Sequence, residues 1–151
     1  MTLIEYETSL AYELLAEKCS DAGPRLLLIS LYEDTKKHAN IMKSICQSLG
    51  QDYPPQMARC EVEMGQAYTE SLSHIRSVKD RLQKGMSLLE ALKSILKDEK
   101  AISEEYLTLL HSKVRLIEED DTALRRVLRD IASDEVKHQE LLELVMDFIS
   151  R

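Results

Sequence analysis

A glutamate and a histidine interrupt the apolar face of the last segment of the chain. Glu135 and His138 belong to a series of positions spaced alternately four and three residues apart, which is typical of the buried face of a helix. The other members are all aliphatic: Leu124, Leu128, Ile131, Leu142, Val145 and Ile149. A carboxylate in an apolar core lowers stability unless it is paired, protonated or bound to a cation. The Glu-x-x-His pair therefore requires a partner, and a metal ion is a natural one.

A second histidine stands at the equivalent position of an earlier segment. His38 belongs to a series with the same spacing, whose other members are Leu28, Leu31, Thr35, Met42, Ile45 and Leu49. When His38 is aligned with His138, an aspartate, a lysine and the histidine coincide in the two segments, and Thr35 stands opposite Glu135. The sequence thus predicts a duplicated site in which one copy lacks the glutamate.

Two further glutamates occur in apolar series of the same kind. Glu5 and Glu99 are each followed seven residues later by a tyrosine. In an antiparallel pair of helices, residues equally far from the connecting turn lie at the same height. Counted from turns near residues 22 and 119, this rule predicts that Glu5 faces His38 and that Glu99 faces His138.

The polar residues of the four segments together predict a metal site in one interior layer. Its expected ligands are Glu5, His38, Glu99, Glu135 and His138. Carboxylate oxygens and imidazole nitrogens without thiolates suit iron or manganese, and zinc also accepts them. The alternative is a hydrogen-bonded polar cluster that fixes the register of the helices, with Tyr12 and Tyr106 as core packing.

The segments that carry these residues are all predicted to be helical. The chain contains only four Gly, three Pro and one Phe, and no Trp, so strand and turn residues are scarce. Capping boxes at Thr2 and Ser87, together with breaks before Pro24 and after Leu49, delimit the elements. We expect a single all-α domain over residues 1–151, with helices at 2–20, 24–49, 88–116 and 122–150. Residues 50–86 are expected to form a long, partly helical crossover with the apolar stripe Tyr68, Leu72, Ile75 and Leu82.

The composition argues against several classes of function. A formal net charge of -7 disfavours binding to nucleic acid. No apolar run approaches the roughly 18 residues of a membrane span, and the amino terminus does not resemble a secretion signal. Cys19, Cys46 and Cys60 are odd in number and form no Cys-x-x-Cys unit. They are expected to be reduced thiols, which favours a cytoplasmic location.

With these motifs the chain resembles the ferritin-like superfamily, and within it the rubrerythrin-like di-iron carboxylate proteins. The pattern of that family is a glutamate on each of two helices and Glu-x-x-His on each of the other two. Glu5 and Glu99 match the single glutamates, Glu135 with His138 matches one Glu-x-x-His, and His38 matches the histidine of the other. The resemblance covers roughly residues 3–150. It implies a four-helix bundle of two antiparallel hairpins joined by the crossover.

The resemblance also implies a function. Two iron ions are expected to react with hydrogen peroxide or dioxygen, or the protein handles iron, and a homodimer is typical. In this reading Glu135 bridges or chelates, Glu5 and Glu99 are terminal carboxylates, and the two histidines are terminal nitrogen ligands.

Two departures from the family pattern stand against this reading. Thr35 replaces a bridging glutamate, for which Asp34, water or the Thr35 hydroxyl would have to substitute. The chain also lacks the Cys-x-x-Cys pair of a rubredoxin-like iron centre, so a redox cycle would need an external electron donor. The alternative, favoured by Thr35, is a ferritin-like bundle with a degenerate or structural site that acts as a binding or scaffold protein.

Overall fold

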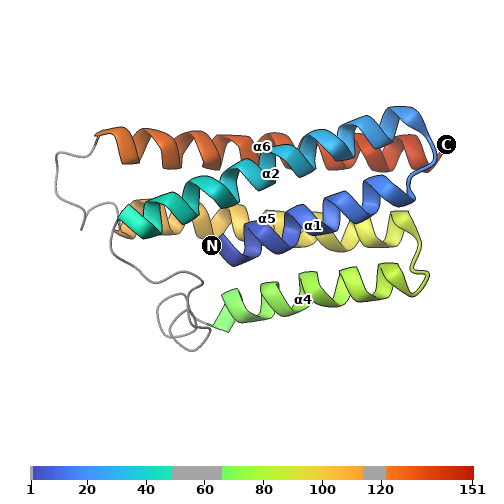
Figure 1. Ribbon diagram of the computed structural model, residues 1–151, viewed down its shortest axis with the longest axis horizontal. Coiled ribbons are helices and arrows are strands. Elements are labelled where there is room, and N and C mark those ends of the chain that lie inside the picture. The colour runs from blue at the N-terminus through green and yellow to red at the C-terminus, as the bar shows by residue number, and fades with distance from the viewer. Residues whose placement is uncertain (1, 49–65, 114–121) are drawn as a thin grey trace.

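The computed structural model describes residues 2–48, 66–113 and 122–151, and the regular structure in these ranges is entirely helical (Figure 1). The helices are α1 (Thr2–Lys18), α2 (Ala22–Ser48), α4 (Gln66–Gln83), α5 (Leu88–Lys113) and α6 (Thr122–Ile149). The prediction of an all-α fold is confirmed. The expected helix ends that fall within the described ranges differ from the observed ends by no more than two residues. The expected end at residue 116 lies outside these ranges.

Local sequence signals explain the sharp turn between α4 and α5. Gly85 has a φ of 104°, a left-handed conformation that favours glycine, and the N–H of Met86 reaches back to the carbonyl of Arg81 at 2.9 Å. Ser87 then accepts a hydrogen bond from the N–H of Glu90 at 3.3 Å, as its capping box predicts. The chain reverses within a few residues, so α4 and α5 form an antiparallel pair.

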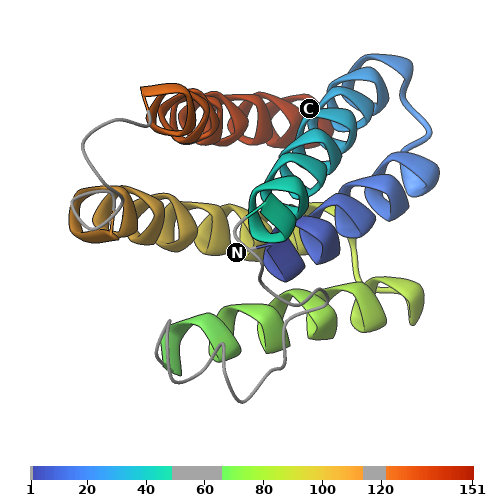
Figure 2. The ribbon, with the colours of Figure 1, turned by 60° about the vertical axis from the view of Figure 1, so that its left-hand side comes forward.

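Four of the helices enclose a common interior. Helix α1 packs along α2 and α5 packs along α6, while contacts between α2 and α6 and between α1 and α5 join the two pairs (Figures 1 and 2). Helices α2 and α5 run in the same direction, as expected for hairpins joined by a long crossover (Figure 1). Helix α4 belongs to that crossover and packs on the outside against α1 and α5 (Figure 2).

The stripes predicted from sequence form the core. The α1 stripe is buried throughout, and it consists of Glu5, Thr8, Tyr12 and Leu15, with Cys19 just after the helix. The central stripe residues of α2 and α6 are buried, as are the described stripe residues at the start of α5. The stripe of α4 is buried as well, with Tyr68, Leu72, Ile75 and Leu82 at most 1% exposed. The crossover helix therefore contributes to the core and does not merely connect its two halves.

Some of the predictions concern parts that the structure leaves undescribed. The side chains of Cys46, Cys60, Tyr106 and Leu124 are among them. Cys19 is a free cysteine and is buried at 3% exposure. Within the described ranges, no helix is both long enough and apolar enough to cross a membrane.

Candidate metal centre

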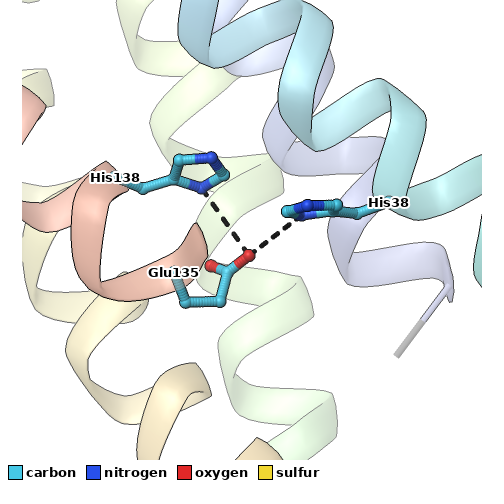
Figure 3. Close-up of side chains that lie close together, drawn as sticks. All are labelled: His38, Glu135 and His138. Carbon is cyan, nitrogen blue, oxygen red and sulfur yellow. Dashed lines mark hydrogen bonds and ion pairs between the residues drawn. The ribbon is translucent and has the colours of Figure 1, made fainter. Parts of the chain in front are cut away.

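The centre of the interior brings together one residue of α2 and two of α6. His38 points from the middle of α2 toward Glu135 and His138, which lie one turn apart on the same face of α6 (Figure 3). All three residues are at most 1% exposed. One potential ligand atom from each can be chosen so that these atoms all lie within 4.8 Å of one another. Residues nearly a hundred positions apart in sequence thus form one buried cluster.

The distances within this cluster suit a common metal ion. Nδ1 of His38 lies 3.1 Å from Oε1 of Glu135, and Nδ1 of His138 lies 3.6 Å from the same oxygen (Figure 3). Two donors each about 2.1 Å from one ion are separated by about 3.0 Å at a right angle and about 3.4 Å at the tetrahedral angle. The two imidazole rings stack with their centroids 5.5 Å apart. Small side-chain movements would therefore allow all three donors to bind one ion.

An aspartate contacts the second ring nitrogen of His38 and so orients the ring. Nε2 of His38 lies 3.3 Å from Oδ2 of Asp134, so the ring presents Nδ1 toward Glu135. Metal-binding histidines commonly use their second nitrogen in this way, because the carboxylate fixes the ring and strengthens the ligand. Asp34 does not serve as a further ligand, because its carboxylate pairs at 3.0 Å with Lys37 and its side chain is 43% exposed.

Tyr12 and Glu99 connect the cluster to the remaining two helices of the interior, α1 and α5. The hydroxyl of Tyr12 in α1 donates a hydrogen bond of 2.5 Å to Oε1 of Glu99 in α5, and both side chains are buried. The carboxyl of Glu99 in turn lies close enough to that of Glu135 for each group to shift the pKa of the other. A continuous chain of polar contacts thus runs from α1 through α5 and α6 to His38 of α2.

The electrostatics shift the pKa values of these two carboxyls in opposite directions. Burial, and next the negative charge of Glu135, raise the pKa of Glu99 well above 4.5. Burial would also raise the pKa of Glu135, but the two histidines and the Glu99 carboxyl stabilise its anion and bring its pKa well below 4.5. The contacts of Glu135 thus favour its anion, whereas burial of Glu99 favours its neutral form.

The buried glutamates of the layer raise the pKa values of both His38 and Tyr12. Burial opposes protonation of His38, but its hydrogen bond to Glu135 and the charge of Glu5 outweigh burial and raise its pKa above 6.5. Burial and the charge of Glu99 raise the pKa of Tyr12 well above 10.0, so the phenol remains a hydrogen-bond donor. A cation would balance the carboxylates of this site more directly than protons do.

All five predicted ligands are buried, but they are not equally close together. Glu5 and Glu99, at 3% and 2% exposure, lie in the same layer and influence its charges, yet neither belongs to the cluster within 4.8 Å. The ring nitrogens of His38 lie within 3.3 Å of Glu135 and Asp134 of α6, while Glu5 acts on His38 through its charge. Distance from the turn predicts only the height of a residue, whereas the rotation of each helix decides which neighbour it meets.

Several buried polar atoms of this layer have no hydrogen-bond partner among the described residues. They include both ring nitrogens of His138 and the hydroxyls of Thr8 and Thr35. Buried polar groups are almost always satisfied, so a ligand absent from the protein chain would account for them. The His138 nitrogens in particular fit a metal ion.

Two features of the site go beyond what the sequence pattern predicts. Asp134 is part of the internal repeat, and its recurrence beside each histidine is the signal that could have marked it as a partner of His38. Tyr12 bonds to Glu99 as well as packing in the core, and the signal for this role is its spacing from Glu5, which recurs in α5. A separate contact joins His74, whose side chain is 42% exposed, to the largely buried Asp98 at 2.6 Å. This contact lies outside the layer, and no spacing pattern in the sequence predicts it.

Comparison of the chain with models of protein families, with curated proteins and with solved structures finds no match. The interpretation of the site therefore depends on its own residues and their geometry.

Proposed function

We propose that this protein is a metal-binding, ferritin-like bundle of the rubrerythrin-like type. The observation that carries the proposal is the buried cluster of His38, Glu135 and His138, in which the nitrogens of His138 lack a hydrogen-bond partner in the described part of the chain. Iron is the metal expected for this donor set, with manganese and zinc as alternatives. Glu5 and Glu99 lie in the same layer and are the carboxylates available to a second ion.

The residues of the chain perform distinct tasks in this proposal. Glu135 and the Nδ1 atoms of the two histidines bind the metal, while Asp134 orients His38. Tyr12 holds the carboxyl of Glu99 in place. The apolar stripes around the layer exclude water. Bound iron would supply electrons for the reduction of hydrogen peroxide or dioxygen, and an external donor would restore them.

A second candidate is a structural or scaffolding role. Thr35, buried at the position of the missing glutamate, favours it, because the site then has fewer ligands than a pair of iron ions normally receives. In that case the contacts among Tyr12, Glu99 and Glu135 serve to fix the register of the helices.

Anaerobic titration with Fe(II) separates the two candidates. Metal-free protein is equilibrated with Fe(II), the bound iron is counted by elemental analysis, and absorbance is followed after addition of peroxide. We expect one or two ions per chain and a spectral change with peroxide. Glu135→Ala should abolish binding, whereas Glu143→Ala should not, because Glu143 lies on the same helix with its side chain 56% exposed.

The number of iron ions bound per chain distinguishes the interpretations. Two ions per chain indicate a pair, and one ion indicates that only the cluster of His38, Glu135 and His138 is filled. Absence of iron above background, or equal binding by the Glu135→Ala variant, rejects the metal-binding proposal and leaves the structural role.

A further inference from the structure

Two threonine hydroxyls stand next to the predicted ligands. Thr35 lies one turn before His38 on the same face of α2, and Thr8 lies one turn after Glu5 on the same face of α1. Their side chains are only 1% and 3% exposed. Neither hydroxyl has a hydrogen-bond partner among the residues that the structure describes. Because buried hydroxyls are rarely left in this state, both call for a ligand.

Both hydroxyls belong to the half of the site that α1 and α2 form. In the internal repeat this half has one glutamate, Glu5, whereas the half formed by α5 and α6 has two, Glu99 and Glu135. Thr35 occupies the position that Glu135 occupies in the other half, and Thr8 corresponds in sequence to Ile102. In the half formed by α1 and α2, hydroxyl groups thus occupy the positions that hold a glutamate and an isoleucine in the other half.

The formal charges of the layer leave room for one anion. Two divalent cations would carry four positive charges, whereas Glu5, Glu99 and Glu135 together supply three negative charges when ionised. One positive charge would then remain in a site that excludes water, which is unfavourable. A glutamate at position 35 would remove this excess, but the shorter, neutral side chain of Thr35 does not.

We propose that a small carboxylate anion, of the size of formate or bicarbonate, binds beside Thr35 and takes the place of the missing glutamate. This inference rests on the proposed metal-binding function. The hydroxyl of Thr35 donates a hydrogen bond to the anion, and the charge of the anion balances that of a second metal ion. Since the anion and the second ion attract each other, each strengthens the binding of the other.

Metal binding in different anions tests this inference. The metal-free full-length chain is titrated anaerobically with Co(II) in chloride, formate and bicarbonate buffers of equal ionic strength. Bound Co(II) is measured by equilibrium dialysis and by its visible absorption. We expect formate or bicarbonate to increase the affinity for the second ion by about 5- to 150-fold, the usual range of coupling between two ligands.

Substitutions at position 35 separate the role of the carboxylate from that of the hydroxyl. Thr35→Glu supplies its own carboxylate and should bind two ions without any added anion. Thr35→Val removes the donor and should reduce the formate effect, while Thr35→Ser should retain it. Thr69→Val is the matched control, because the hydroxyl of Thr69 bonds to the backbone of its own helix, and it should behave as wild type. Circular dichroism verifies that each variant is helical.

Each outcome decides one of the two proposals. Formate dependence in the wild type that disappears in the Thr35→Glu variant supports the anion site, and an effect of bicarbonate alone identifies the anion. Equal affinity for Co(II) in all three buffers overturns the anion site but leaves the metal-binding function standing. Absence of bound Co(II) in every buffer overturns both.

Discussion

The hydrogen bond between Tyr12 and Glu99 offers a direct test of the interior network. Tyr12→Phe preserves the shape of the side chain but leaves the buried carboxyl of Glu99 without its donor, which lies 2.5 Å away. Loss of one partner of a buried hydrogen bond destabilises a protein by about 1–3 kcal/mol. For a chain of this size each kcal/mol corresponds to about 2–4 °C in Tm. We therefore expect the Tm to fall by about 2–12 °C.

The metal-free protein is unfolded by urea, which gives the free energy of unfolding, and by heat, which gives the Tm. Both are followed by the helical circular dichroism signal in the presence of a chelator. Tyr12→Phe is measured both in the wild type and in a Glu99→Leu background. If the hydrogen bond is the cause, the loss should be smaller by about 0.5–3 kcal/mol in the second background. Tyr32→Phe is the matched control. Its hydroxyl accepts a hydrogen bond of 2.7 Å from the exposed Lys36, so its effect should remain within about 0.5 kcal/mol.

Two results would refute this reasoning. One is an equal cost of Tyr12→Phe in both backgrounds, which would assign the loss to packing instead of the hydrogen bond. The other is a cost no greater than that of Tyr32→Phe, which would mean that the network does not stabilise the fold.

Three further predictions concern α4, the surface charges and the metal. Leu72→Ala should lower the free energy of unfolding by about 2–5 kcal/mol in urea denaturation, because Leu72 is 1% exposed; a loss below about 1 kcal/mol would contradict the place of α4 in the core. Burial opposes ionisation of Glu7, but its hydrogen bonds from Lys79 and Arg76 lower its pKa below 4.5. The stability that this group provides is therefore present above pH 4.5 and is lost as the pH falls through its lowered pKa. Glu7→Gln should flatten this acid limb of the stability profile, and an unchanged limb would exclude Glu7 as its source. Fe(II) at a hundredfold excess over its dissociation constant should stabilise the protein by about 2.7 kcal/mol. This corresponds to a rise of about 5–11 °C in Tm. A chelator should reverse the rise, and its persistence in the Glu135→Ala variant would contradict the site.

Much of the fold could be predicted from the spacing of residues. The stripes in the four long segments and in residues 66–83 follow from helical periodicity, which depends only on neighbours along the chain. The helix ends near Pro24, Gly85 and Ser87 follow from equally local rules of backbone conformation and capping.

The sequence also predicts a shared layer for the five candidate ligands, because an antiparallel hairpin relates distance from the turn to position along the bundle. That Glu5, His38, Glu99, Glu135 and His138 are all buried could likewise be predicted, because each occupies an otherwise largely apolar stripe.

The partners of these side chains were decided only by the tertiary structure. Whether His38 meets Glu5 or Glu135 depends on how far each helix is rotated about its axis, and that rotation results from the packing of all the helices together. The same packing directs Asp134 to His38 and the hydroxyl of Tyr12 to Glu99. It also leaves the hydroxyl of Thr35 buried without a partner among the described residues. The sequence by itself thus determined which residues occupy the interior and at what level, because these depend on periodicity and chain length. Only the assembled helices decided which of those residues touch, because contacts across helices depend on rotations that no single segment specifies.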